Sequence, residues 1–290
     1  MSLNNSVRRK LEELRGSSII DADLLSGGCI SNAYRITFAD EGIYLLKLRE
    51  HENGDMFIKE GHGLQELKKA GAIRVPEVVA CDSGFILLEF IDSAPKQKNF
   101  YEEFGRRFAH LHQYTSIEFG FYENNYIGST PQINIPDNKT RHNWVSFYFT
   151  NRLLFQFRLL EKNGYADSAI RDAFGKLENK IDTIIDITDS PPSLLHGDLW
   201  SGNYMSDENG NACLIDPAVY YGNREADLAM TKLFGGFPST FYNSYNETFR
   251  LPDEWQYREN IYMLYHVMNH LNLFGGGYYS HTLSLMRSYL

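Results

Sequence analysis

The amino-acid sequence predicts an α+β fold with two lobes: a small N-terminal lobe with an antiparallel β-sheet and one packed helix, and a larger, mainly helical C-terminal lobe. Residues 19–91 contain short apolar runs of strand length, separated by turn residues. Beyond residue 96, apolar residues recur instead at the spacing of one helix face. The polar stretch Asp92–Lys96 separates the two patterns. We therefore predict lobes at residues 1–91 and 92–290.

Length, composition and charge exclude several classes of protein. A chain of 290 residues, 43% of them hydrophobic, can bury a sizeable core. Its formal net charge of −9 repels polyanions, which argues against nucleic acid or an anionic membrane as a partner. We find no apolar run of a signal peptide or of a membrane span. The cysteines Cys29, Cys81 and Cys213 lie far apart, which predicts neither a disulfide framework nor a zinc site, and we expect a cytoplasmic protein.

The N-terminal lobe is predicted to contain a β-meander, one helix and a final strand. The first turn of the meander is Ser26-Gly27-Gly28. Gly71 ends the helix, because glycine readily adopts the left-handed conformation that follows many helix C-termini. A polar amphipathic helix precedes the meander. The expected bounds are Met1–Arg15 and Phe57–Ala70 for the helices and Ile19–Leu25, Ala33–Phe38, Ile43–Leu48 and Phe85–Ile91 for the strands.

The C-terminal lobe is predicted to be helical with one strand-rich interruption. Residues 194–216 form this interruption, and they contain Asn209-Gly210 between two apolar runs. An Asn-Gly pair in this setting is the strongest short signal for a β-hairpin. The expected helices lie around Phe104–Leu111 and over Trp144–Leu160, Ile170–Ile185 and Ile261–Met268.

The predicted hairpin carries side chains that suit a metal ion. If Asn209 and Gly210 are the two central turn residues, Asn203 and Asp216 lie opposite each other at the open end of the hairpin. A four-residue loop would instead shift the register and break this pairing. An amide oxygen beside a carboxylate suits Mg²⁺, which prefers oxygen ligands. Asp198, shortly before Asn203, is the candidate general base for a nearby hydroxyl.

The pattern His196-x-Asp198-x-x-x-x-Asn203, followed by Asp216, resembles the catalytic and metal-binding motifs of the protein-kinase-like superfamily. The resemblance implies that Lys47, on the third strand, holds the phosphates of ATP, and that Glu60, on the next helix, pairs with Lys47. We assign His196 to packing and hydrogen bonding of the catalytic loop.

The same resemblance implies further nucleotide-binding groups. Backbone N–H groups of the turn Gly27-Gly28 would cover the phosphates. Backbone groups from Glu89 to Ile91 would bind adenine. Asp227 would brace the backbone of the catalytic loop.

Departures from the protein-kinase pattern indicate a small-molecule kinase. Gly197 stands where protein kinases carry Arg, and Asp216-Pro217-Ala218 replaces Asp-Phe-Gly. The Ala-Pro-Glu motif and its activation loop are missing before the next expected helix, which starts near Arg224. The sequence therefore carries no evident platform for a protein substrate.

Further stretches along nearly the whole chain carry a second resemblance. They are residues 27–30, Met56-Phe57 with Glu60 and Gly63-Leu64, residues 196–203, 216–222, 224–230 and 233–237, Tyr265-His266 and residues 269–272. In these stretches the sequence resembles the fructosamine/ketosamine kinase family of small-molecule kinases. The resemblance implies a two-lobed kinase-like fold, with ATP and Mg²⁺ as cofactors, and phosphorylation of the sugar 3-hydroxyl of a ketosamine or glycated lysine, a deglycation activity.

Two residues are expected to contact the sugar substrate. Trp200, just after the base, could stack on the apolar face of a sugar, and His270 is expected to form a wall of the pocket. We expect the protein to be a monomer. Oxidation of the thiol of Cys29 would offer a route to a disulfide-linked dimer. Two alternatives stay open: a kinase of aminoglycosides, choline or another amino alcohol, and a nucleotide-binding sensor of kinase fold without catalysis.

Overall fold

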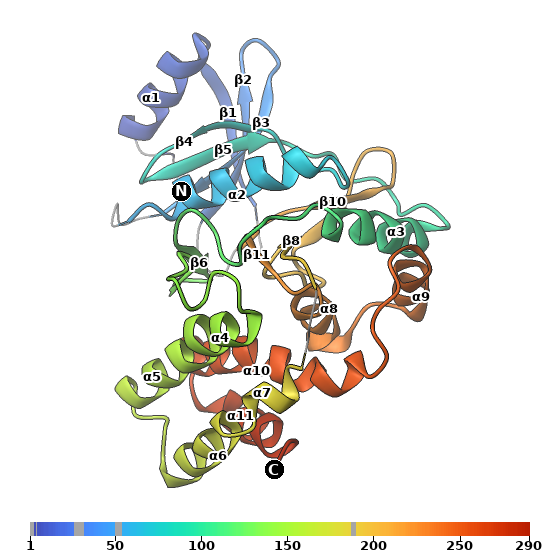
Figure 1. Cartoon of the computed structure of the whole chain (residues 1–290). Coiled ribbons are helices and arrows are strands. Elements are labelled where there is room, and N and C mark those ends of the chain that lie inside the picture. The colour runs from blue at the N-terminus through green and yellow to red at the C-terminus, as the bar shows by residue number, and fades with distance from the viewer. Residues whose placement is uncertain (1–2, 4, 26–31, 50–53, 187–189) are drawn as a thin grey trace.

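A computed structural model describes the protein at residue 3 and over residues 5–25, 32–49, 54–186 and 190–290 (Figure 1). Five antiparallel strands form one N-terminal sheet in the order β1-β2-β3-β5-β4. The helix α2 lies between this sheet and the C-terminal part of the chain (Figure 1). The elements are α1 (Asn5–Arg15), β1 (Ile19–Leu25), β2 (Asn32–Phe38), β3 (Ile43–Leu48), α2 (Met56–Ala70), β4 (Val78–Cys81) and β5 (Phe85–Glu89).

Strand β5 is covered on both faces, which explains its uninterrupted apolar sequence. Phe85 and Leu87 pack in a cluster with Leu11 of α1. Ile86 and Leu88 belong to the main core, which α2 shares. Side chains alternate between the two faces of a strand, so a strand with both faces covered needs apolar residues at every position. The strand ends at Glu89, two residues before the predicted end.

The predicted α2 ends as expected. Gly71 caps the helix in the left-handed conformation with φ 63°, and its N–H donates to the carbonyl of Lys68. Strand β4 was not predicted, since its residues are all half-buried and give no alternating pattern.

The C-terminal part is helical around the buried α10, which packs against α5, α8 and α11 (Figure 1). Two expected helices are interrupted. A π-helical segment, η1, divides the expected Trp144–Leu160 helix, and residues 179–180 divide the expected Ile170–Ile185 helix. The helices are α3 (Phe100–His112), α4 (Trp144–Tyr148), η1 (Phe149–Leu154), α5 (Phe155–Lys162), α6 (Ser168–Glu178), α7 (Ile181–Ile184), α8 (Glu225–Lys232), η2 (Leu233–Gly235), α9 (Ser239–Thr248), α10 (Trp255–Phe274), η3 (Gly276–Tyr278) and α11 (Tyr279–Arg287).

Three small antiparallel pairs of strands complete the C-terminal part, and only one of them was predicted. That pair is β9–β10, the expected hairpin, and the others are β6–β7 and β8–β11. Strands of three residues are too short for a periodic sequence pattern. The bounds are β6 (Asn125–Ile127), β7 (Thr130–Gln132), β8 (Ser193–Leu195), β9 (Tyr204–Ser206), β10 (Ala212–Leu214) and β11 (Tyr220–Gly222).

The predicted fold class is confirmed: an antiparallel sheet with a packed helix is followed by a mainly helical part. No helix in the described ranges is both long enough and apolar enough to cross a membrane.

Three histidines are buried in the C-terminal part. Burial lowers the pKa of His112, His196 and His266, because a charged ring is disfavoured away from water. For His266 the pKa falls to about 3. A lowered pKa in the folded state means that stability is fully present above the unfolded pKa of about 6.5 and is lost as the pH falls.

We therefore expect the free energy of unfolding to decrease as the pH falls from about 7.5 to about 5. A neutral buried histidine contributes a slope of about 1.4 kcal/mol per pH unit below the unfolded pKa. His266→Gln should flatten the profile by about this slope in equilibrium denaturation at a series of pH values. His142→Gln, at a side chain that is 65% exposed, is the control. An unchanged slope in His266→Gln would contradict a neutral buried ring.

Candidate active site

The β9–β10 hairpin carries Asn203 and Asp216, but its register differs by one residue from the prediction. Tyr204 pairs with Leu214. The N–H of Ile215 donates to the carbonyl of Asn203 at 3.1 Å, so Asn203 lies opposite Ile215. The predicted pairing of Asn203 with Asp216 across the hairpin is therefore wrong.

The turn of the hairpin explains this shift. The N–H of Gly210 donates to the carbonyl of Asp207 at 2.9 Å, which places Glu208 and Asn209 at the centre of the turn. Gly210 follows with φ 78°, in the left-handed region. The Asp207 carboxylate also accepts the N–H groups of Asn209 and Asn211. A turn followed by a left-handed glycine has one residue more than the two-residue turn that Asn-Gly predicts.

Asn203 and Asp216 nevertheless meet in one cleft of about 670 Å³. Asp216 has φ 55°, a left-handed conformation that is uncommon for residues other than glycine and frequent at functional sites. Asp198, Lys47 and Glu60 line the same cleft. The structure thus brings together five residues that were predicted from their order along the chain.

Lys47 extends from β3 and pairs with carboxylates of two other elements. Its Nζ lies 2.7 Å from Oε1 of Glu60 on α2 and also contacts Oδ1 of Asp216. Burial by itself would lower the pKa of Lys47, but the two carboxylates outweigh burial and hold this pKa above its ordinary value. Burial raises the pKa of Glu60 in spite of Lys47. Lys47 therefore stays charged and joins the sheet, α2 and the end of the hairpin.

The carboxylate of Asp227 in α8 holds the start of the predicted catalytic loop, residues 196–203, through hydrogen bonds. Asp227 accepts the N–H of His196 at 2.7 Å and the N–H of Gly197 at 2.8 Å. His112 Nε2 lies 3.3 Å from the same carboxylate. Burial would raise the pKa of Asp227, but the hydrogen bonds and the nearby histidines keep this pKa below its usual value. The prediction that Asp227 braces the loop is confirmed.

The other loop residues are held equally closely. His196 Nε2 donates to the carbonyl of Ile215 at 2.9 Å, so its Nδ1 is the acceptor for the N–H of Asp198 at 3.3 Å. This confirms the role predicted for His196. Gly197 has φ 82°, and a Cβ there would lie 2.0 Å from the carbonyl oxygen of Ala218, so this position requires glycine.

Asp198 and Asn203 form a hydrogen-bonded pair. Asn203 Nδ2 donates to Oδ2 of Asp198 at 3.1 Å and to its carbonyl at 2.8 Å. Burial, together with the nearby charge of Asp216, raises the pKa of Asp198 well above its usual value. A bound cation near these carboxylates would therefore stabilise the charged form of Asp198.

The donor atoms of Asn203 and Asp216 fit Mg²⁺. Because Nδ2 of Asn203 is engaged with Asp198, its Oδ1 is left as an acceptor. The side chain of Asp216 is 46% exposed. Within the described ranges, no group of three His, Cys, Asp or Glu side chains could hold a metal ion. Phosphate and water oxygens would supply the remaining ligands, as is usual for Mg²⁺.

Both residues predicted to contact substrate line the cleft. The indole of Trp200 packs close to Gly202, where a Cβ would approach the ring to 2.4 Å. His270 of α10 contacts Phe234 in an edge-to-face arrangement, with ring centroids 5.1 Å apart. Phe234 was given no role from the sequence, although two glycines directly after it signal an unusual turn.

The structure describes only some of the residues that were predicted to bind the nucleotide. Gly27, Gly28 and Cys29 lie outside the described residues. The N–H of Glu89 donates to the carbonyl of Glu77 at 2.8 Å, so adenine could use at most the carbonyl of Glu89. Ile91 follows as a buried residue.

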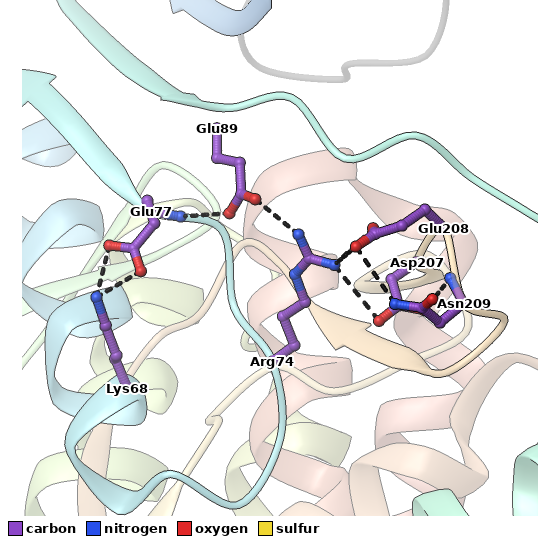
Figure 2. A network of polar contacts seen from close by, with 7 residues as sticks. All are labelled: Lys68, Arg74, Glu77, Glu89, Asp207, Glu208 and Asn209. Carbon is purple, nitrogen blue, oxygen red and sulfur yellow. Dashed lines mark hydrogen bonds and ion pairs between the residues drawn. The ribbon is translucent and has the colours of Figure 1, made fainter.

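Arg74 joins the N-terminal sheet to the hairpin, as Figure 2 shows. Its guanidinium lies 2.6 Å from Oε1 of Glu89 at the end of β5 and contacts Glu208 and Asp207 in the hairpin turn. The carbonyl of Arg74 accepts the N–H of Leu214 at 2.9 Å. The sequence offers no signal for this role, since a single arginine before an extended segment is most often a solvated charge.

The whole chain is similar to one family of kinases. A family profile described as fructosamine kinase matches residues 3–290. The chloroplastic protein-ribulosamine 3-kinase of Oryza sativa subsp. indica is 36% identical over 287 residues, which cover 97% of this chain and 82% of the rice protein. A candidate ketoamine kinase of Vibrio parahaemolyticus is 38% identical over 263 residues, which cover 88% of this chain and 87% of that protein.

Solved structures share the fold. A candidate fructosamine-3-kinase from Thermobifida fusca matches with a TM-score of 0.88 and 29% identity over 99% of each chain. An aminoglycoside phosphotransferase in a complex with streptomycin and ATP matches with a TM-score of 0.67 and 14% identity over 99% of this chain and 97% of that one. At so low an identity, this second likeness concerns the fold alone. The predicted two-lobed, kinase-like fold is confirmed.

Asp227→Asn should destabilise the protein, because the amide would point an N–H group at one of the two loop N–H donors. We expect a loss of about 2 to 4 kcal/mol in the free energy of unfolding, the cost of buried polar groups without partners. Amide hydrogen exchange at residues 196–197 should also accelerate. Asp172→Asn is the matched control, since Asp172 pairs with Lys176 on the exposed face of α6. Equal stability of the two variants would contradict the bracing role.

Proposed function

Since the chain belongs to the fructosamine kinase family, as its motifs indicated, and is a phosphotransferase, we propose that it transfers the γ-phosphoryl group of ATP to a sugar hydroxyl of a ketosamine. The observation that carries this proposal is the meeting of Lys47, Glu60 and Asp216 beside Asp198 and Asn203 in one cleft. These are the groups that phosphoryl transfer to an alcohol requires.

Lys47 binds the phosphates of ATP as a fixed positive charge. Glu60 orients its ammonium group, since their ion pair at 2.7 Å spans β3 and α2. When phosphate oxygens bind, they compete with Asp216 for Lys47, and the Asp216 carboxylate is released toward the metal site. The transition state of phosphoryl transfer is loose, so positioned charge contributes most of the catalysis.

Asp198 acts as the general base. It would accept the proton of the sugar hydroxyl as the bond to phosphorus forms, late in the reaction. Its hydrogen bond with Asn203 fixes the carboxylate, and Asp227 fixes the loop behind it. Asn203 and Asp216 would hold Mg²⁺, which would neutralise charge on the phosphates.

The remaining nucleotide contacts stay proposals. We assign phosphate covering to the backbone of Gly27 and Gly28, and adenine binding to the backbone from Glu89 to Ile91. These segments precede and follow Lys47 in the N-terminal part, in the order that the kinase-like fold requires.

The acceptor is proposed to be the 3-hydroxyl of a ketosamine, free or attached to a protein lysine, with deglycation as the result. The names of the relatives support a ketoamine or ribulosamine substrate. Between Asp216 and the start of α8 at Glu225 the chain forms only the short strand β11, which leaves no activation segment for a peptide substrate. Trp200 and His270 line the same cleft as Asp198, where they would contact the ketosamine.

Asp198→Asn should lower kcat at least about 10²-fold, the scale of positioned acid–base catalysis. The assay is consumption of Mg-ATP with fructosyl-lysine, ribulosyl-lysine, kanamycin, choline or no acceptor. Asp172→Asn serves as the control, because this carboxylate lies on the exposed face of α6. Near-normal turnover in Asp198→Asn would contradict its role as base.

The acceptor panel separates the proposed function from its alternatives. Turnover confined to the ketosamines supports the proposal. Turnover with kanamycin or choline alone would leave the catalytic residues in place and show that the substrate class is wrong. ATP binding without turnover of any acceptor would favour a sensor of kinase fold.

A further inference from the structure

One wall of the cleft is built from aromatic rings, which we call the aromatic collar. Consecutive rings touch: Trp200 and Phe234 have centroids 5.6 Å apart, Phe234 and His270 5.1 Å, His270 and Tyr278 5.2 Å, and His270 and Phe274 5.5 Å. All five side chains line the same cleft as Asp198. The members of the collar are Trp200, Phe234, His270, Phe274 and Tyr278.

Two phenylalanine rings of the collar are unusually exposed to solvent. Phe234 is 44% exposed and Phe274 is 58% exposed, although the core of this protein buries most of its aromatic rings. Both rings contact His270 at the cleft. Exposed aromatic surface that gathers in a cavity, rather than singly over the surface, indicates a ligand-binding wall.

The backbone around Phe234 is strained in a way that aims its ring at the cleft. Phe234 has φ 59°, and Gly235 and Gly236 follow with φ 102° and 73°. Its neighbours Leu233 and Phe237 are both buried in the core. A left-handed phenylalanine is costly, and such strain persists where a functional position needs it. The buried neighbours anchor the turn while Phe234 alone turns outward.

Trp200 is placed by the absence of a side chain at Gly202. A Cβ there would lie 2.4 Å from the indole, so any larger residue at this position would require the ring to move. The indole thus extends the collar to within two residues of the base Asp198. A ligand on the collar therefore lies in the same cleft as Asp198, where we propose that phosphoryl transfer occurs.

The collar carries no permanent charge of its own. His270 Nδ1 donates to the carbonyl of His266 at 2.7 Å, which leaves Nε2 as an acceptor. Burial lowers the pKa of His270, so the ring is neutral near pH 7. Among the described residues that line the cleft, Lys47 and Lys59 are the permanent cations, and both are paired with carboxylates. The negative faces of the rings are therefore free to attract a cation from the ligand.

We propose that the aromatic collar binds the protonated amine of the substrate, with the first carbons of its N-substituent, through cation–π and apolar contacts. This inference rests on the proposed function and deepens it. In a ketosamine only C1, C2 and C3 lie between the amine nitrogen and the 3-hydroxyl, so an amine on the collar places this hydroxyl near Asp198. The collar would then select amine-linked sugars over neutral sugars of the same shape.

The test compares N-hexyl-fructosamine with 1-O-hexyl-fructose, its uncharged ether analogue. The wild-type protein should prefer the amine in kcat/KM. Phe234→Leu and Phe274→Leu remove a ring but keep an apolar side chain, and each should reduce the amine-to-ether ratio by about 2- to 30-fold, the range of a cation–π contact. Phe274→Tyr keeps the ring and should retain the ratio. Tyr257→Leu, an exposed aromatic outside the cleft, should leave it unchanged.

Equilibrium binding of both compounds without ATP separates failure of this inference from failure of the proposed function. If the wild-type protein binds the amine better than the ether and the Leu variants lose this preference, the collar stands even where no phosphoryl transfer occurs. Equal binding and turnover of amine and ether by the wild-type protein would overturn the inference and leave the kinase activity intact. If the Leu variants lose affinity for the amine and the ether to the same extent, the inference would also be overturned. The rings would then contribute only apolar surface.

Discussion

A buried ammonium group shared between two carboxylates sets the geometry of the cleft. Lys47 comes from the sheet, Glu60 from the helix beneath it and Asp216 from the end of the C-terminal hairpin. Moving such groups out of water costs free energy that an ion pair in a protein interior often only just offsets. The arrangement is therefore poorly explained as a source of stability. It fits the proposed role of Lys47 as the charge that binds phosphate between the sheet and the C-terminal part.

Two other charged groups hold the segment that carries Asp198 and Asn203. Asp227 accepts N–H groups at the start of the loop, so its position follows the buried α8. Arg74 binds the hairpin turn and, through Glu89, the end of β5 (Figure 2). Asp198 and Asn203 lie between these two anchor points along the chain, and Asp216 follows the second one. Such preorganisation is what a reaction driven by charge and alignment demands, because no energy is then spent on reorganising the site during the reaction.

The cleft combines two chemically different walls. The carboxylates and Lys47 form a polar side that suits phosphate, a metal ion and a hydroxyl, whereas the aromatic collar forms a side that suits an amine and its carbon substituent. A ketosamine carries these same two parts, an amine and a 3-hydroxyl, with three carbon atoms between them. The two walls thus match the proposed acceptor, although the chain between Asp216 and α8 forms only the short strand β11.

The sequence by itself determined the fold class, the bounds of β1 and β3, the end of α2 at Gly71 and the residues that meet in the cleft, because local periodicity, turn chemistry and motif order encode them. Tertiary structure alone decided the rest. The hairpin register depends on N–H groups that the Asp207 side chain captures, and β5 needs cover on both faces. The collar joins segments far apart in the chain, around residues 200, 234 and 270–278, which no local pattern relates. Contacts between such distant residues depend on how the helices pack, and packing is settled only when the whole core forms.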